Sequence, residues 1–389
     1  MLLLLLVSVC CPATVTAVEV LARGGDTCAH RGVYEVALAG AGGLGSAFYD
    51  DTVTVTFARA AGSVAVAAFY DGNGVYRARA YCDTLGPWTW SAAVAAGSAM
   101  QLSASAGAFA VAASRLPGQL RAHAGDSRQF AYDNGTWFLH VGDTAYRYLI
   151  PTEPEWQEYV DQAVLAGFTK TRAWLAGNRF TVTPVFSGDA MDVAYWQEMD
   201  RRLTYALVRY PGFIFQIIPY AEDGHQIQKA FEGDRQALLV ASYTQARWSA
   251  YPNVYFSITN DRKIVNDPTN IDVRKIYRQA LLAVATTMAA NEPWGTLLTN
   301  HQNRGSGYFF VSEPWSDVIT LEDKDQVAGA LILQYRALGT DPVVLDEDRY
   351  ERYLDPAAPR YFFRRLMWVS LLSGGMATYG KGKIDKKRE

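Results

Sequence analysis

The sequence predicts a two-domain α/β protein in which a (β/α)8 barrel follows a small, all-β, immunoglobulin-like sandwich. The chain has 389 residues, too many for one average domain and enough for two. The hydrophobic pattern changes near Gly125, from short alternating strands to apolar strands that alternate with helical stretches. Half of the residues are hydrophobic and 19% are charged, which is typical of globular proteins.

Residues 1–17 are predicted to be a signal peptide. They contain an apolar run and end in Val15-Thr16-Ala17, which resembles a signal-peptidase site. The run is too short to span a bilayer, and no later segment reaches about 18 uninterrupted apolar residues. We therefore expect a secreted or periplasmic protein without a membrane span.

Composition narrows the classes of partner and cofactor. The net charge of -3 gives no basic footprint for nucleic acid or an anionic membrane. After the leader only Cys28 and Cys82 remain, which form either one bridge or two buried free thiols. No cluster of His and Cys exists, so we expect no metal and no cofactor. The 10 Trp and 23 Tyr suit either sugar stacking or an ordinary large core.

Residues 18–124 are predicted to form the sandwich, as an accessory domain. Segments 33–38, 52–57 and 64–69 alternate or are rich in β-branched residues, and the turn at 71–74 precedes another strand at 75–81. A spacing of about 8–12 residues between strands is typical of such sandwiches. No acidic pair or histidine cluster lies there in a catalytic setting.

Residues 125–389 are predicted to form the barrel. Strands in regular alternation with helices favour a closed parallel barrel. An open doubly wound sheet is the competing topology, but no GxGxxG follows the first strand. The predicted strands are 138–143, 168–175, 213–219, 254–259, 296–300, 317–321, 342–345 and 375–379. The predicted helices are 153–166, 194–210, 234–251, 273–290, 324–338 and 360–372.

Two predicted strands end in carboxylates that face one barrel mouth. Strand four runs into Asp261 and strand seven into Glu347, and barrel enzymes place their reacting groups at these ends. Such a pair suits glycoside hydrolysis, which needs one proton donor and one carboxylate for the oxocarbenium-like centre. A single acid there is more often a helix cap or ion-pair partner. Glu351 is the alternative to Glu347, which follows the β run directly.

Other polar and aromatic residues close the same strands. We interpret them as substrate contacts that hold sugar hydroxyls or supply stacking faces, although a lone histidine is often structural. The predicted substrate-contact residues are Asp143, Trp174, Tyr220, Asn260, His301, Tyr350 and Tyr379.

The order of these motifs resembles the apiosidase-like glycoside hydrolases, bacterial barrel enzymes of clan A type with an N-terminal sandwich. The similarity covers nearly all of the mature chain. The matching stretches are 69–72, 141–145, 251–254 leading to Asn260-Asp261, 342–347 with Tyr350-Glu351, Arg365, Gly374-Gly375 and Tyr379-Gly380.

The resemblance implies a retaining double displacement, with Asp261 as acid/base and Glu347 as nucleophile. Most clan A barrels carry Glu after the Asn, whereas this family and this chain carry the shorter Asp, which suits a compact furanose. The expected substrate is a polysaccharide side chain, with apiosides as one class. The alternatives are an endo-acting glycanase on a pyranose backbone and a non-catalytic carbohydrate-binding barrel.

One departure from the family lies at the end of the chain. Family members usually continue past Tyr379-Gly380 with a closing helix and a small β-domain, whereas residues 381–389 are a charged tail. We therefore expect a barrel truncated at its C-terminus, with apolar surface exposed on strands one and eight.

Overall fold

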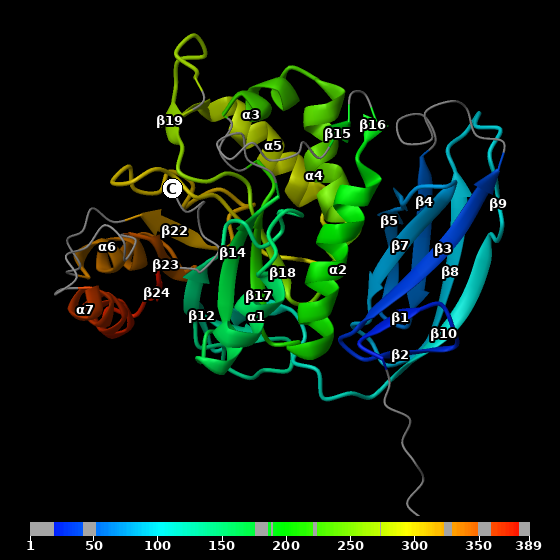
Figure 1. Ribbon diagram of the computed structural model, residues 1–389, viewed down its shortest axis with the longest axis horizontal. Helices are drawn as coiled ribbons and strands as arrows, with labels where there is room; N and C mark the ends of the chain where they lie inside the picture. Colours follow the sequence, from blue (N-terminus) through cyan, green and yellow to red (C-terminus); the bar gives the residue numbers. More distant parts are fainter. Residues whose placement is uncertain are drawn as a thin grey trace, which may run out of the picture.

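The computed structural model describes residues 19–41, 52–175, 186–187, 190–220, 224–272, 274–322, 329–348 and 359–380. Figure 1 shows the N-terminal β-domain beside a helix-covered parallel sheet, with helix α2 (Val193–Arg209) between them. The expected signal peptide and the charged tail lie outside the described residues. Within the described part of the chain, no helix is long and apolar enough to cross a membrane.

The N-terminal domain consists of two sheets that share one core. Side chains alternate along paired strands, so that Tyr34, Val36 and Leu38 of β3 (Val33–Ala41) all enter this core. One sheet contains β1 (Leu21–Arg23), β3, β7 (Val75–Tyr81), β6 (Phe69–Tyr70) and β9 (Gln101–Leu102). The other contains β2 (Thr27–Ala29), β10 (Ala106–Ala112), β8 (Gly86–Val94), β4 (Val53–Arg59) and β5 (Gly62–Ala67). The predicted β-domain is confirmed, and its immunoglobulin-like character stays a prediction.

The two cysteines of this domain are buried free thiols. Cys28 lies in β2 and Cys82 follows β7, so they come from opposite sheets. Their sulfur atoms are 2.8 Å apart. Burial raises the pKa of Cys82, and the neighbouring Cys28 raises it further. Of the two sequence-based alternatives, the structure has the free thiols.

The C-terminal domain is an eight-stranded, all-parallel barrel, as predicted. Its order is β21-β18-β17-β14-β13-β24-β23-β22. The seam between β21 and β22 is joined by the Asp317 amide, which donates to the Leu298 carbonyl oxygen at 2.9 Å. The strands are β13 (Val141–Thr144), β14 (Lys170–Trp174), β17 (Ile214–Ile218), β18 (Val254–Ser257), β21 (Leu298–Thr299), β22 (Ile319–Glu322), β23 (Val343–Glu347) and β24 (Met376–Thr378).

Helices cover the outside of this barrel. All six predicted helices are present, but residues 275–277, predicted as part of helix 273–290, form the strand β20 instead. Helix α3, strand β19 and the pair β15 and β16 were not predicted. Besides α2, the helices are α1 (Trp156–Leu165), α3 (Gly224–Phe231), α4 (Arg235–Trp248), α5 (Arg278–Ala290), α6 (Ala330–Leu338) and α7 (Pro359–Leu372). The short strand pairs are β15 (Phe186–Ser187) with β16 (Ala190–Met191) and β19 (Lys263–Val265) with β20 (Lys275–Tyr277).

A hairpin closes the N-terminal end of the barrel. β11 (Leu120–His123) and β12 (Asp126–Tyr132) pair around the domain boundary predicted after residue 124. Leu120 and Phe130 of this hairpin belong to one apolar cluster with the barrel-lining Ile214, Tyr255 and Val344. This floor leaves the opposite end, at the carboxyl ends of the strands, as the end that can receive a substrate.

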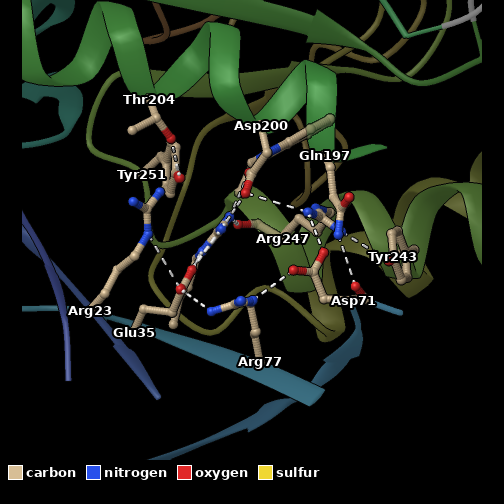
Figure 2. A network of polar contacts seen from close by, with 12 residues as sticks. Arg23, Glu35, Asp71, Arg77, Gln197, Asp200, Thr204, Tyr243, Arg247 and Tyr251 are labelled. Atoms are coloured by element: carbon tan, nitrogen blue, oxygen red, sulfur yellow. Dashed lines mark hydrogen bonds and ion pairs between the residues drawn. The ribbon is translucent and has the colours of Figure 1, made fainter. Parts of the chain in front are cut away.

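Buried ion pairs join the two domains (Figure 2). Arg79 on β7 contacts Glu35 on β3 at 2.8 Å, and it also contacts Asp200 on α2. Arg247 on α4 contacts Asp71 at 2.9 Å and Asp200 at 3.4 Å. The residues of this interface cluster are Glu35, Asp71, Arg77, Arg79, Asp200 and Arg247. The cluster fixes the sandwich on α2 and α4 and lies outside the barrel.

Candidate active site

The barrel interior is polar above its apolar floor. Lys170 on β14 donates a hydrogen bond to Asp346 on β23, and the Thr378 hydroxyl on β24 donates to the same carboxylate at 2.6 Å. Burial lowers the pKa of Lys170 to about 8, so the amine stays charged at neutral pH. Burial alone would raise the pKa of Asp346, but Lys170 and Arg172 outweigh it and hold that pKa well below its usual range.

A β-bulge turns two consecutive acids toward the interior. Leu345 pairs with Leu321 and Glu347 pairs with Glu322, so Asp346 is an extra residue on β23. In a regular strand successive side chains point to opposite faces. Because of the bulge, Asp346 reaches Lys170 inside the barrel while Glu347 reaches the side chains of the mouth.

The carboxylate of Glu347 is held by two donors at the mouth. The Tyr146 hydroxyl donates to Glu347 Oε2 at 2.6 Å, and Arg172 Nη2 donates to the same oxygen at 2.8 Å. Arg172 is fully buried and also donates to Asn260 Oδ1 and Thr144 Oγ1, each at 3.2 Å. These contacts orient Glu347 and compensate its negative charge.

Asp261 lies on a tight turn after β18. Its φ of 49° is in the left-handed region, which Asp adopts more readily than most residues. Its backbone N–H donates to Nδ1 of His301 at 3.2 Å. Burial lowers the pKa of His301 to about 4, and Arg172 lowers it further, so this imidazole is neutral at pH 7. A non-glycine residue with positive φ is frequent at functional sites.

Glu322 is a third carboxylate of the mouth, which the sequence analysis missed. It ends β22, is 8% exposed, and accepts a hydrogen bond from Arg304 Nε at 2.9 Å on Oε1. Burial raises its pKa well above the usual value, and Glu347 and Asp261 raise it further. The influence of both acids on one group shows that the ends of strands four, six and seven share one electrostatic site.

The missed residues carried different signals. Glu322 directly follows the predicted strand 317–321, so the strand-end rule that selected Asp261 and Glu347 identifies it equally well. Tyr146 gave no such signal, because it lies beyond a strand end in a loop. Arg172 lies within a predicted strand, where a charged residue of a barrel points either inward or to a helix, and the sequence does not say which.

Three predicted contact residues are at this mouth. Asn260 and His301 contact Arg172 and the Asp261 backbone, as described above. Trp174 is fully buried and stacks on Tyr146, with ring centroids 4.1 Å apart and an interplanar angle of 15°. Trp174 therefore supports the ring that holds Glu347.

Three other predicted contact residues face away from the mouth. Asp143 accepts a hydrogen bond from Tyr159 on α1 at 2.9 Å, on the helix side of β13. The Tyr220 hydroxyl donates to the Ala237 carbonyl oxygen on α4 at 2.6 Å. Tyr379 packs on Phe363 of α7, with ring centroids 4.3 Å apart. The structure thus brings none of these three to Glu347. Tyr350 and the alternative nucleophile Glu351 lie outside the described residues.

Comparisons with known proteins agree with this architecture. A candidate glycoside hydrolase from Bacteroides vulgatus has a similar fold, with a TM-score of 0.74 and 19% identity over 92% of this chain and 72% of that chain. A family 5 glycoside hydrolase from the same organism gives a TM-score of 0.54 and 18% identity over 69% of this chain and 64% of that chain. No curated protein matches the chain.

Family models cover both domains. Residues 32–95 match a domain of unknown function, DUF5060. Residues 124–388 match the catalytic domain described as apiosidase-like, which confirms the family that the sequence motifs resemble. The chain is therefore a glycosidase and belongs to the family of apiosidase-like catalytic domains.

Proposed function

We propose that this protein is a retaining, exo-acting glycosidase that releases a furanose, such as apiose, from polysaccharide side chains. Glu347 is the nucleophile and Asp261 the acid/base. The observation that carries the proposal is the pair of donors on Glu347 Oε2, from Tyr146 and Arg172. They keep one carboxylate oriented at the carboxyl end of strand seven, as attack on an anomeric carbon requires.

The reaction proceeds in two balanced steps. Glu347 attacks the anomeric carbon, the glycosidic carbon–oxygen bond breaks, and Asp261 gives its proton to the leaving oxygen. A water molecule then attacks the same carbon, Asp261 takes the proton of that water, and the bond to Glu347 breaks. The product keeps the anomeric configuration of the substrate.

The proposed preference for a furanose follows from Asp261. Asp is one methylene shorter than Glu, and the left-handed turn at this residue ties its backbone to His301. Both features keep the acid close to the end of strand four. A compact sugar ring that lies deep in the mouth suits such an acid. If an Asp261→Glu variant keeps full activity on apiosides and arabinofuranosides, this part of the proposal fails.

Sugar release from pectic and arabinose-containing glycans tests the activity itself, with apiose monitored directly. We expect monomeric product from the parent protein and none from Glu347→Ala. Oligomeric products would show endo action instead. NMR of the first-formed anomer tests the mechanism, because inversion of configuration would exclude Glu347 as a covalent nucleophile.

The assignment of Asp261 needs a separate test, since Glu322 is a rival proton donor. Dinitrophenyl glycosides have a leaving group that needs no protonation. We expect Asp261→Asn to lose activity on the glycan by about 10²- to 10⁴-fold and to form the glycosyl-enzyme normally from the dinitrophenyl substrate. Glu322→Gln is the matched control. If Glu322→Gln alone shows this pattern, Glu322 is the acid/base.

A further inference from the structure

Two buried polar atoms at the mouth have no hydrogen-bond partner within the described ranges. Glu322 Oε2 and His301 Nε2 make no hydrogen bond to any residue that the structure describes. His301 is fully buried and Glu322 is 8% exposed. Buried polar groups are almost always hydrogen-bonded, so these two atoms are available to bond a ligand that enters the mouth. A ring nitrogen of His301 and carboxylate oxygens of Glu322 and Glu347 lie within 4.8 Å of one another.

His301 presents a donor to this space. Its Nδ1 accepts the Asp261 backbone N–H, and its pKa of about 4 leaves the ring neutral at pH 7. A neutral imidazole carries one proton, which must then be on Nε2. A metal ligand needs a lone pair on the coordinating nitrogen. The hydrogen bond from Asp261 therefore disfavours a divalent cation among these three residues.

Glu322 presents a second donor. Its Oε1 accepts from Arg304 Nε, which leaves Oε2 as the oxygen that faces no described partner. Burial and the neighbouring Glu347 raise the pKa of Glu322 well above its usual value, which favours the neutral carboxylic acid. Its proton belongs on Oε2, because Oε1 is already an acceptor.

One sugar hydroxyl satisfies all of these groups. A hydroxyl oxygen accepts two hydrogen bonds and donates one, and the site offers two donors beside an acceptor carboxylate. We propose that His301 Nε2 and Glu322 Oε2 both donate to one hydroxyl of the sugar in the cleavage subsite, and that this hydroxyl donates to Glu347. The proposal rests on the proposed function, and it adds a specificity site made by strands five and six. Proximity to Glu347 places the hydroxyl on a carbon close to the anomeric one.

The test compares Glu322→Gln with Glu322→Leu. A glutamine amide accepts from Arg304 and donates from its nitrogen, as the neutral acid does, whereas leucine does neither. On nitrophenyl apiofuranoside and arabinofuranoside, we expect Gln to stay within about tenfold of the parent kcat/KM and Leu to lose about 100-fold. His301→Ala should lose a similar factor. Asp317→Asn, another buried acid, is the control and should keep the parent kcat/KM.

Deoxy substrates identify the hydroxyl. The same kinetics are measured on glycosides that lack the hydroxyl next to the anomeric carbon or the one after it. On one of these two substrates we expect Glu322→Leu and the parent to have equal kcat/KM, because the contact is already absent. If the 100-fold loss persists on both deoxy substrates, the proposal is overturned and Glu322 acts only through the surrounding structure.

Binding measurements separate this proposal from the proposed function. Calorimetric titration with free apiose and arabinose needs no turnover. We expect Glu322→Leu and His301→Ala to bind these sugars more weakly than the parent, and Glu322→Gln to keep the affinity of the parent. If the parent shows no glycosidase activity but this pattern holds, only the proposed function fails. Equal sugar affinity of all variants overturns the hydroxyl site. Titration with Zn²⁺ is the last arm: binding that disappears in Glu322→Gln would show a cation site instead.

Discussion

Two groups of charged residues lie in this molecule, and they are built differently. The interface cluster pairs three arginines with three carboxylates, and the exposed Arg23 adds a fourth cation at 3.6 Å from Glu35. The barrel mouth, defined by Lys170, Arg172, Arg304, Asp261, Glu322, Asp346 and Glu347, has three cations and four acids. Both groups contain buried atoms without a hydrogen bond to a described residue: Arg247 Nε in the interface cluster, and Glu322 Oε2 and His301 Nε2 at the mouth.

The difference between the two clusters shows how burial of charge serves two purposes. Burial would raise the pKa of Asp200, but Arg79 and Arg247 outweigh it and hold that pKa well below its usual range. The opposite holds for Glu322, whose pKa is raised by burial and by acid neighbours. A cluster in which each carboxylate faces an arginine stabilises one arrangement of two domains, whereas carboxyl groups that face one another favour the protonated form of one of them, as at catalytic sites.

The largest effect is expected for activity at the mouth. Glu347→Gln should lower kcat/KM by at least about 10⁴-fold, because it removes the nucleophile. The same change takes the carboxylate from the fully buried Arg172 at 2.8 Å, but it also removes the charge that raises the pKa of Glu322, so the free energy of unfolding should fall by less than in a variant of the interface cluster. Kinetics on an aryl glycoside and denaturant unfolding check both parts. If Glu347→Gln lowers the free energy of unfolding as much as a substitution in the interface cluster does, the two clusters do not differ in this way.

The next effect is expected for stability at the interface. Asp200→Asn leaves Arg79 and Arg247 without a shared carboxylate, and breaking such a buried pair costs about 3–5 kcal/mol of unfolding free energy. The folded fraction should keep its kcat/KM, since the cluster lies outside the barrel. Asp272→Asn breaks the solvent-exposed pair with Lys275 at 3.0 Å and should cost less than about 1 kcal/mol. Similar costs for both variants would contradict the prediction.

Arg172→Lys tests whether catalysis depends on the hydrogen-bond geometry of Arg172 and not only on its charge. Lysine keeps the charge but cannot donate to Glu347, Asn260 and Thr144 at once. We expect kcat to fall by about 100-fold with a much smaller change in KM, because the orientation of Glu347 matters in the transition state. Steady-state kinetics measure this split. Arg121→Lys, at the closed end of the barrel, is the control, and an equal loss there would rule out a specific role for Arg172.

The smallest effect concerns a buried acid outside both clusters. Burial raises the pKa of Asp317 to about 6, so the folded protein keeps this proton up to about pH 6 while the unfolded chain loses it near pH 4. The stability from this proton is fully present below pH 4 and is lost as pH rises through 6. Relative to the parent, Asp317→Asn should therefore be more stable at pH 7 than at pH 4, by about 2 kcal/mol. If the variant and the parent differ in the free energy of unfolding by the same amount at pH 4 and at pH 7, the prediction is wrong.

Much of the barrel follows from local patterns. All eight strands and six helices predicted for it are present, because an apolar run or a helical periodicity reports on the burial of each element. The unpredicted α3 and the strand pairs β15–β16 and β19–β20 belong to segments that follow the carboxyl ends of barrel strands, where no strict periodicity is required. The Asp261 and Glu347 assignments stay predictions, and the structure supports them by placing both acids within the electrostatic reach of Glu322.

The site depended on details that strand-end position does not contain. Asp143 and Thr144 are neighbours at the end of β13, yet Thr144 contacts Arg172 inside the barrel and Asp143 contacts Tyr159 outside it. Tyr220 and Tyr379 face helices for the same reason. Side chains along a strand alternate between two faces. A shift of one residue in the strand therefore decides whether a side chain points into the barrel, where a substrate binds, or toward the surrounding helices.

By itself, the sequence determined that this chain is a sandwich followed by a parallel barrel, and that acids end the fourth and seventh barrel strands. Those properties depend on hydrophobic period and strand order, which are local. Only the tertiary structure decided that the consecutive residues Asp346 and Glu347 both point inward. The physical reason is the single extra residue of β23, because a bulge changes the direction of a side chain only through the strands it pairs with.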